Sequence, residues 1–250
     1  MVRMILVSLV AFLFFAGCAN APVTGRSQMI LIGADQEMAL GLSESENILS
    51  QSKLTTNKTL AARVENIGKK IVAVSEEAKQ YEWSFYVIEE DVLNAFALPG
   101  GKVFFYTGIL KLMANDDQIA TVMGHEIGHV LARHGAERMS QQMATNLGGQ
   151  ILSTALNLPA GQQGIFEMVY GTASNYGVIL PFSRKHETES DIIGVNLMFK
   201  AGYDPNEAVA FWEKMSSAKS GAASPEFLST HPADSTRIAD IKNYIKTLKK

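Results

Sequence analysis

The segment HEIGH at residues 125–129 has the residue types and the spacing of a metal site. On a helix, residues four apart lie one turn above each other, so His125 and His129 can reach a single metal ion. Glu126 lies about 100° round the helix from His125, where it can take a proton from a metal-bound water. Zinc is the natural occupant of a site with His nitrogens, one carboxylate and one open position. The segment therefore predicts a zinc centre with Glu126 as general base.

Such a centre needs a third protein ligand, and one class of zinc peptidase supplies it as a histidine six residues after the second. Gly135 stands at that place, and His134 is one residue short. That class is therefore excluded, and we expect the ligand to be a glutamate from a second helix.

The segment SRKHETESD at residues 183–191 offers two such glutamates. Arg184, Glu187 and Asp191 share a helix face at spacings of three and four, whereas Glu189 points nearly the opposite way. With Glu187 on the metal, Asp191 could hold the N–H of a ligand histidine, and Arg184 could brace the carboxylates. On spacing alone, a surface lattice of charges on an exposed helix is an equally good interpretation.

A third motif lies late in the chain, where Thr230-His231-Pro232 precedes Arg237-Ile238. With HEIGH and the R-x-x-E-x-x-x-D pattern of the later helix, it resembles the gluzincin metallopeptidase family of the HtpX and CAAX prenyl protease type. The soluble, lipid-anchored periplasmic members and the related mitochondrial quality-control peptidase are the most similar. The resemblance covers nearly the whole chain from about residue 25.

The resemblance implies a zinc metalloendopeptidase that holds one Zn²⁺ per chain. It implies His125, His129 and Glu187 as the ligands, with Glu126 as the general base and Asp191 as the carboxylate behind a ligand histidine.

His231 by itself is one loop histidine, and a surface position is the simpler interpretation. The resemblance places it beside the metal instead, where it stabilises the oxyanion or covers the open coordination position. The segment NAFALPGG at residues 94–101 matches a family edge strand on which a peptide substrate adds as a further strand. This implies Asn94, Ala95 and Phe96 as substrate-binding residues, although an ordinary core strand explains Phe96 equally well.

The elements that position these residues follow from periodicity and turn signals. We predict a short strand at 28–32 and helices at about 35–51, 57–74, 116–131, 183–200, 204–216 and within 232–250, with strands at 83–88, 92–98 and 102–107. Asp35 and Asn57 or Thr59 are the expected caps of the first two helices. Two loosely defined helices are expected within 145–181, and a loop at 219–225. The fold class is therefore α+β: a mainly helical zincin-like domain with a small β-sheet beside the HEIGH helix.

The N-terminus predicts where in the cell the protein is located. Arg3 precedes an apolar run at residues 4–15, which ends in Ala16-Gly17-Cys18. This pattern fits a secretory signal and resembles the lipobox of bacterial lipoproteins, with a buried thiol after an ordinary signal as the alternative. We therefore predict a signal peptide at 1–17, a lipidated tether at 18–27 and a zinc metallopeptidase domain at 28–250. Because Ala19 is not the Asp that marks inner-membrane retention, the outer membrane facing the periplasm is the expected location.

Composition narrows the function further. With 47% hydrophobic and 19% charged residues, the 250-residue chain can bury the core of one enzyme domain. Its net charge of -3 predicts no nucleic-acid partner, and the single cysteine excludes an internal disulfide and a Cys-based zinc site.

We therefore expect a cell-envelope protease whose partners are misfolded or unassembled envelope proteins, with a membrane reached through the lipid anchor. One alternative is a zinc-bearing chaperone or assembly factor for outer-membrane proteins, with a blocked site. The other is a structural lipoprotein with a relict site.

Overall fold

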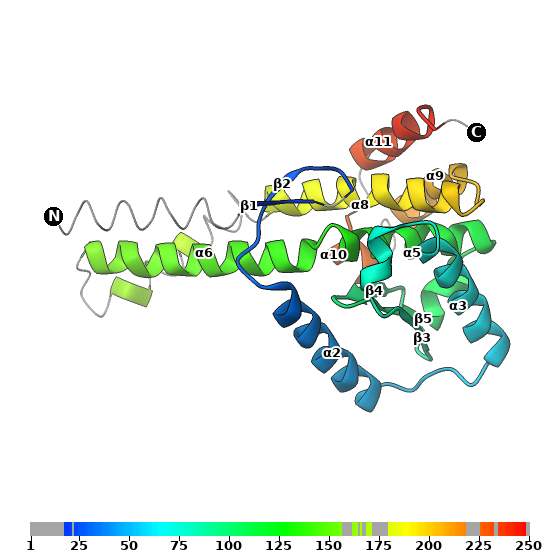
Figure 1. Cartoon of the computed structure of the whole chain (residues 1–250), viewed down its shortest axis with the longest axis horizontal. Helices are drawn as coiled ribbons and strands as arrows, with labels where there is room; N and C mark the ends of the chain where they lie inside the picture. The colour runs from blue at the N-terminus through cyan, green and yellow to red at the C-terminus, as the bar shows by residue number, and fades with distance from the viewer. Residues whose placement is uncertain are drawn as a thin grey trace.

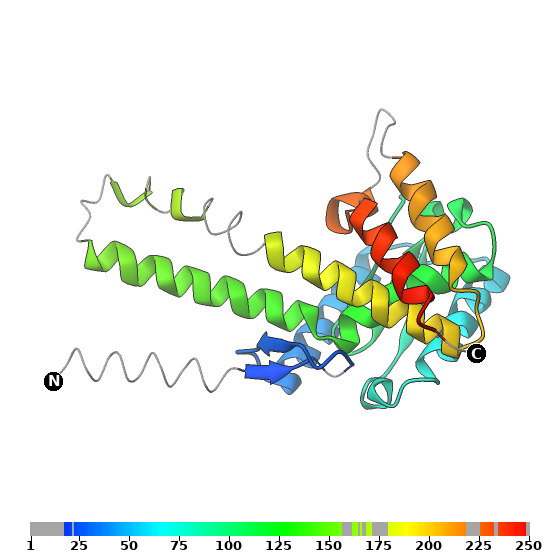
Figure 2. The ribbon, with the colours of Figure 1, turned by 90° about the horizontal axis from the view of Figure 1, so that it is seen from above.

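A computed structural model describes residues 18–21, 23–156, 162–164, 166, 169–171, 180–218, 226–232 and 235–248. Figures 1 and 2 show a mainly helical body that contains a small sheet, and one long helix that extends from the body on one side. The predicted α+β fold is confirmed. Within the described residues, no helix is both long enough and apolar enough to cross a membrane.

The helices lie close to their predicted positions. In chain order they are α2 (Ala34–Gln51), α3 (Lys58–Val72), α4 (Thr107–Leu112), α5 (Asp116–Leu131), α6 (His134–Ala155), α8 (Leu180–Lys200), α9 (Asn206–Ala218), α10 (Glu226–Thr230) and α11 (Ser235–Ile245). The strands are β1 (Cys18–Asn20), β2 (Ser27–Met29), β3 (Ser84–Ile88), β4 (Ala95–Leu98) and β5 (Lys102–Tyr106), and a 3₁₀ turn spans Glu77–Gln80.

Side-chain hydrogen bonds cap the N-termini of two of these helices, at or next to the predicted residue. The Asn57 side chain accepts a hydrogen bond from the Leu60 N–H and caps α3. Asn115 caps α5 in the same way, one residue before the acidic pair where we expected the helix to begin. The predicted cap Asp35 is wrong, because Gly33 holds the N-cap position of α2 and Asp35 lies in the first turn.

The three predicted strands form one mixed sheet in the order β3-β5-β4. The β5 strand pairs in parallel with β3 and antiparallel with β4. Among the described residues, no strand pairs with the outer side of β4, so this strand is an edge of the sheet.

The α5 and α8 helices approach each other unusually closely. A Cβ atom on Gly124 would lie 2.8 Å from the carbonyl oxygen of Gly194, and one on Gly128 would lie 2.8 Å from the Ser190 hydroxyl. Ser190 also donates a hydrogen bond to the backbone carbonyl of His125. Because glycine has no side chain at these crossing points, the backbone of α8 can lie against the HEIGH turn of α5.

The predicted tether at residues 18–27 is wrong as a description of this segment. β1 pairs antiparallel with β2 in a hairpin, with Cys18 opposite Met29 and Asn20 opposite Ser27. The side chain of Arg26, which lies between the two strands, forms ion pairs with Glu137 on α6 and Glu189 on α8. Small polar residues indicate flexibility locally, but the ion pairs that fix this hairpin come from more than a hundred residues away.

The long α6 helix explains part of the region that was hardest to predict. It continues to Ala155, so the first of the two helices expected within 145–181 is its outer half. Several apolar side chains on this half are exposed, namely Met143, Leu147, Ile151, Leu152 and Leu156. Most of residues 157–179, the predicted loop at 219–225 and the predicted signal at 1–17 lie outside the described residues.

Candidate metal centre

Four side chains from three parts of the chain converge on one point. His125 and His129 come from α5, Glu187 comes from α8, and His231 follows α10 directly. One ligand atom from each lies within 4.8 Å of all the others. The predicted ligands are therefore neighbours, and His231 joins them.

The donor atoms themselves are close. The Nε2 atoms of His125 and His129 lie 3.1 Å apart, and each lies 3.3 Å from an oxygen of Glu187. His231 Nδ1 lies 3.1 Å from His125 Nε2 and 2.9 Å from Glu187 Oε2.

The tautomer of His125 follows from its other ring nitrogen. His125 Nδ1 lies 2.9 Å from Asp191 Oδ1, and an ionised carboxylate can only accept. Nδ1 therefore carries a proton in either charge state of the ring. When the ring is neutral, as a metal ligand must be, the lone pair of Nε2 faces Glu187 and the second imidazole. Two imidazoles and one carboxylate are the donor set that zinc prefers, so the residues present fit that metal.

Charge and burial act on these groups in opposite directions. Burial opposes a positive charge on His125, but Asp191 and Glu187 outweigh it and raise its pKa to about 9. Burial holds the pKa of His129 well below its ordinary value. Burial also opposes ionisation of Glu187, but His231 and His129 outweigh it, so the pKa of this carboxyl lies well below its usual range. Glu187 and Asp191, whose pKa is also lowered, therefore stay ionised and attract a positive charge to this place.

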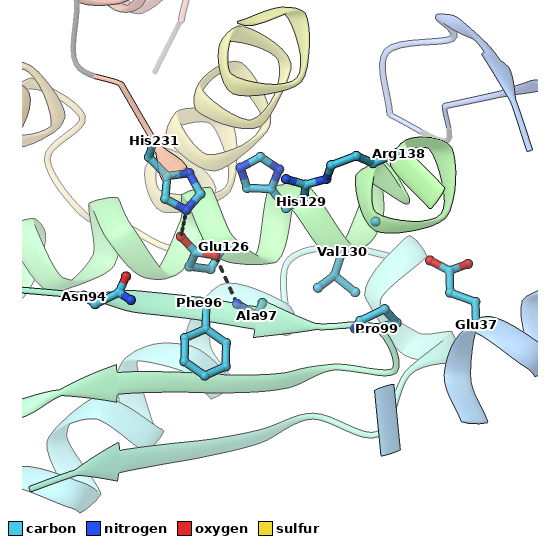
Figure 3. Close-up of a pocket in the computed structure, with 11 residues that line it drawn as sticks. Glu37, Asn94, Phe96, Ala97, Pro99, Glu126, His129, Val130, Arg138 and His231 are labelled. Carbon is cyan, nitrogen blue, oxygen red and sulfur yellow. Dashed lines mark hydrogen bonds and ion pairs between the residues drawn. The ribbon is translucent and has the colours of Figure 1, made fainter. Parts of the chain in front are cut away.

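The two carboxylate oxygens of Glu126 differ in their hydrogen bonds. Its Oε2 atom accepts a hydrogen bond from the backbone N–H of Ala97 at 3.1 Å (Figure 3). Among the described residues, no group donates a hydrogen bond to its buried Oε1 atom, which lies 3.6 Å from His231 Nε2. Burial raises the pKa of Glu126, although His231 and His125 oppose this. A buried carboxylate with a free oxygen and a raised pKa suits a general base.

A cavity of about 280 Å³ opens over these groups (Figure 3). Its wall includes β4 on one side and α5 on the other, and its lining residues are Glu37, Asn94, Phe96, Ala97, Pro99, Glu126, His129, Val130, Gly135, Arg138 and His231. Asn94 and Phe96 thus line the cavity, as expected of substrate-binding residues. The Ala95 side chain is instead fully buried in the core, so only its backbone can serve a substrate. Sequence reasoning missed Ala97, whose N–H meets Glu126.

Asp191 lies behind His125 as predicted, but its arginine partner is a different one. Arg237 holds Asp191 with Nε and Nη2 at 2.6 and 2.8 Å, and its Nη1 atom lies 3.2 Å from Glu187 Oε2. Its guanidinium stacks 3.9 Å over the ring of Trp212. Arg184 is wrong as the brace, because its side chain is exposed and lines a separate hollow beside Arg26.

Glu189 turns away from the metal cluster, as the face argument predicts, but its side chain is buried there. It pairs with His134, which contacts His129. Sequence reasoning gave His134 no role once it had failed as a ligand. A histidine at the start of the helix after HEIGH was the signal that could have identified it.

Comparisons with known proteins agree with this geometry. Residues 58–245 match peptidase family M48. The mitochondrial metalloendopeptidase OMA1 of Saccharomyces cerevisiae is 34% identical over 93% of this chain and 73% of the relative, and that of Schizosaccharomyces pombe is 34% identical over 93% and 68%. The Beta-barrel assembly-enhancing protease of Escherichia coli K12 is 30% identical over 92% of this chain, which spans about half the length of that relative.

The match covers α3 through α11, and therefore every residue of the cluster and the strand beside it. The donor set that fits zinc thus lies inside the segment that matches family M48, and the OMA1 relatives are named as metalloendopeptidases. On these grounds the chain belongs to peptidase family M48 and is a zinc metalloendopeptidase.

Proposed function

We propose that this protein is an endopeptidase of the bacterial cell envelope that cleaves misfolded or unassembled envelope proteins. The observation that carries the proposal is the buried Oε1 atom of Glu126, which accepts no hydrogen bond from the described residues. Glu126 lines a cavity between the metal cluster and an edge strand. That arrangement places a base, an electrophile site and a surface for extended peptide within one pocket.

The residues divide the work as follows. His125, His129 and Glu187 would hold zinc, which when bound acidifies a water and polarises the scissile carbonyl. Glu126 takes the proton of the attacking water on Oε1, while the Ala97 N–H fixes its other oxygen. The same carboxyl then protonates the leaving amine. His231 Nε2 lies beside Glu126 Oε1, where it is placed to stabilise the oxyanion.

The free edge of β4 supports an unfolded substrate. Edge strands recruit extended peptides through backbone hydrogen bonds, which make few demands on the side chains. Ala97 turns its N–H away from β5 toward Glu126, so the catalytic base and the peptide-binding edge are in direct contact. A misfolded protein exposes the extended segments that such an edge accepts.

A lipid anchor on Cys18 is the second part of the proposal, and it places the protein at the outer membrane facing the periplasm. It rests on the apolar run at 4–15 that ends in Ala16-Gly17-Cys18. Cys18→Ala should leave the protein unlipidated in metabolic acyl labelling. Unchanged labelling of the variant would refute the anchor and leave the peptidase chemistry untouched.

A second candidate function is that of a zinc-bearing assembly factor whose site is blocked. It is favoured by His231, which lies within 3.1 Å of both His125 Nε2 and Glu187 Oε2 and so can serve as a fourth ligand. Four protein ligands make a closed, structural zinc site rather than a catalytic one. The relative from E. coli is named as a protease that enhances β-barrel assembly, and assembly of outer-membrane proteins would then be the activity of this chain as well.

Cleavage of an unfolded protein tests the first proposal. Purified full chain, Glu126→Gln and the exposed-site control Glu46→Gln would be incubated with casein, with zinc content assayed in each. We expect all three to hold zinc, the wild type and the control to cut, and Glu126→Gln to be inactive. Zinc in all three with no cutting by any would contradict the peptidase and favour the assembly factor.

The variant His231→Ala separates an oxyanion donor from a blocking ligand. If His231 stabilises the oxyanion, its loss lowers kcat by about a hundredfold. If it occupies the open position, cleavage rises because that position becomes free for water.

A further inference from the structure

A buried line of polar contacts runs from the β1–β2 hairpin to the ligand His129. His129 Nδ1 lies 2.8 Å from His134 Nδ1, and His134 Nε2 lies 3.0 Å from Glu189 Oε2. Arg26 Nε donates to the same oxygen of Glu189 at 2.6 Å, and the Thr24 hydroxyl donates to the other. His134 is fully buried, so water does not compete for these bonds.

The direction of each hydrogen bond follows from the carboxylate end. Glu189 accepts from Arg26 Nε and from the Thr24 hydroxyl, so it is the acceptor for His134 Nε2 as well. His129 turns its Nε2 atom to the metal cluster, so its Nδ1 atom carries the ring proton. That N–H donates to His134 Nδ1, the remaining nitrogen of a ring whose other nitrogen already donates.

We propose that Arg26, Glu189 and His134 form a positioning relay that fixes the ring orientation and the tautomer of the ligand His129. The inference rests on the zinc centre of the proposed function and deepens it. His125 is held by Asp191 directly, in the usual carboxylate–histidine arrangement behind a metal. His129 is held by a carboxylate that acts through an intervening imidazole, so the two ligands have separate supports.

The relay makes the hairpin part of the metal centre. Arg26 is its one member that lies outside the helices, and it belongs to a segment that the sequence alone marks as a tether. Its guanidinium binds Glu189 with Nε and Glu137 with Nη1 and Nη2, at 3.0 and 2.6 Å. Arg26 of the hairpin therefore holds the Glu189 carboxylate in place, and Glu189 in turn orients His134.

A second branch from Arg26 supplies a matched control. It leads through Glu137 to His186, whose Nε2 lies 2.9 Å from Glu137 Oε2. The rings of His186 and His134 are stacked, with centroids 4.2 Å apart, so the two are buried in the same place. In this stack, His134 is the ring that contacts His129.

The test compares His134→Phe with His186→Phe in the full chain, with zinc affinity measured by competition with a chromophoric chelator. Phenylalanine keeps the ring stack in both variants, but in His134→Phe it leaves the His129 Nδ1–H without an acceptor. We expect His134→Phe to lower zinc affinity about tenfold to a hundredfold. His186→Phe should change it by less than about threefold, because the hydrogen bond of His186 Nε2 goes to Glu137, which is not a ligand.

Two further readouts distinguish positioning from a structural role. The visible d–d absorption of Co²⁺ bound in place of zinc reports ligand geometry, and it should shift in His134→Phe and Glu189→Gln but not in His186→Phe. His134→Asn should recover part of the affinity, because its Oδ1 replaces the Nδ1 acceptor. Glu189→Gln should lower zinc affinity in the wild-type background and have no further effect once His134 is Phe.

Each outcome decides between the relay and the centre it serves. Wild-type zinc affinity in His134→Phe, with zinc lost in His129→Ala, would overturn the relay and leave the zinc centre standing. Zinc retained in His129→Ala would instead overturn the centre itself. If thermal unfolding shows that His134→Phe does not fold, Glu189→Gln carries the test, and wild-type zinc affinity with an unshifted Co²⁺ spectrum in that variant would overturn the relay.

Discussion

At the scale of single residues, Asp191 has the most constrained side chain of the site. It accepts from His125 Nδ1 on one side and from two nitrogens of Arg237 on the other, and it is buried throughout. Burial opposes its charge, but Arg237 and His125 outweigh this and lower the pKa of Asp191. The carboxylate is therefore ionised at neutral pH and can accept a hydrogen bond from the His125 N–H.

Replacing Asp191 by Asn should lower zinc affinity about tenfold to a hundredfold. The amide offers one acceptor where His125 and Arg237 both need one, so one of them is left facing an N–H₂ group. Chelator competition measures the effect, with the exposed Asp35→Asn on α2 as control. Equal affinities in the two variants would contradict the role of Asp191.

Glu137 should make the metal-free protein sensitive to acid. Burial opposes its ionisation, but His186 and Arg26 outweigh this and lower its pKa to about 2 from an ordinary 4.5. A carboxyl with a depressed folded pKa stabilises fully above its unfolded pKa and loses that contribution as the pH falls toward the folded pKa. The contribution at neutral pH is about 3 kcal/mol.

Thermal unfolding in chelator tests this, with wild type compared to Glu137→Gln from pH 7 to pH 3. We expect the variant to be less stable at pH 7 and the gap to narrow below about pH 4.5. A gap that is constant with pH would show that Glu137 acts through packing and not through its charge. The exposed Glu46→Gln is the control and should show no gap.

The residues that sequence identified and those it missed differ in where their partners lie. His125, Glu126 and His129 interact through helix spacing, which is a local property and is visible in the sequence. Arg237 meets Asp191 across 46 positions, and Arg26 meets Glu189 across 163. No periodicity encodes such pairs. Helix spacing favours Arg184, which shares a face with Glu187 and Asp191, but tertiary packing places Arg237 against these carboxylates instead.

At the scale of elements, the crossing of α5 and α8 sets the geometry of the site. Each helix contributes part of the donor set, and the glycines at the crossing decide how near the two parts come. The atoms that an added Cβ would meet at Gly124 are backbone atoms of Gly194, which cannot rotate aside.

Gly124→Ala should therefore push the two helices apart. We expect a loss of about 1–3 kcal/mol in the free energy of unfolding, together with weaker zinc binding, because Glu187 moves with α8. Gly171→Ala is the control, since a Cβ there meets no atom of the described residues within 4 Å. Unchanged zinc affinity in Gly124→Ala would mean that the crossing distance does not set the donor geometry.

The edge position of β4 makes a prediction about substrates that needs no change in the protein. In a strand, alternate N–H groups point to opposite sides, so a peptide paired with β4 donates from every second residue. Methylating a peptide nitrogen that faces β4 should lower kcat/KM, and methylating the next one should be tolerated.

A series of peptides with one N-methyl group moved along the chain would measure this. We expect kcat/KM to alternate with a period of two residues over the span of β4. A series without alternation would contradict strand addition and indicate recognition by side chains. The unmethylated peptide is the reference.

Elements were predicted well where their own sequence determines them. The α5 helix and the three strands of the sheet carry strong periodicity, and α5 also has a clear cap. Each was predicted to within a few residues of its observed bounds. The β1–β2 hairpin was not, because its short strands carry no periodic signal and Arg26 holds it from outside. The length of α6 was missed for a related reason. Its glycines and polar residues resemble those of loops, and its outer half packs little.

At the scale of the whole molecule, the metal centre brings together donors from three parts of the chain. Its donors come from α5, α8 and the residue after α10. Arg237 of α11 binds Glu187 and Asp191 on α8, and it donates to the backbone carbonyl of Pro232, next to His231. Anything that binds these donors in the folded protein alone stabilises the fold by mass action.

Removing zinc should therefore lower the melting temperature of the entire domain. At a free zinc concentration of about a thousand times Kd, the stabilisation is about 4 kcal/mol. We expect chelator to lower the Tm of the wild type and of Glu126→Gln equally, since Glu126 is not a ligand. In His125→Ala the Tm should be independent of zinc, and a zinc-dependent Tm in that variant would contradict the assigned donors.

The order of the donors along the chain has a consequence for when the enzyme becomes active. His125 and His231 are in contact although 106 positions separate them. A ribosome that adds about 5–20 residues per second completes HEIGH roughly 5 to 20 seconds before it reaches His231. During that interval the nascent chain carries the hydrolytic motif without the groups that enclose it. The peptidase thus has no complete active site until the ribosome has added 106 positions beyond His125.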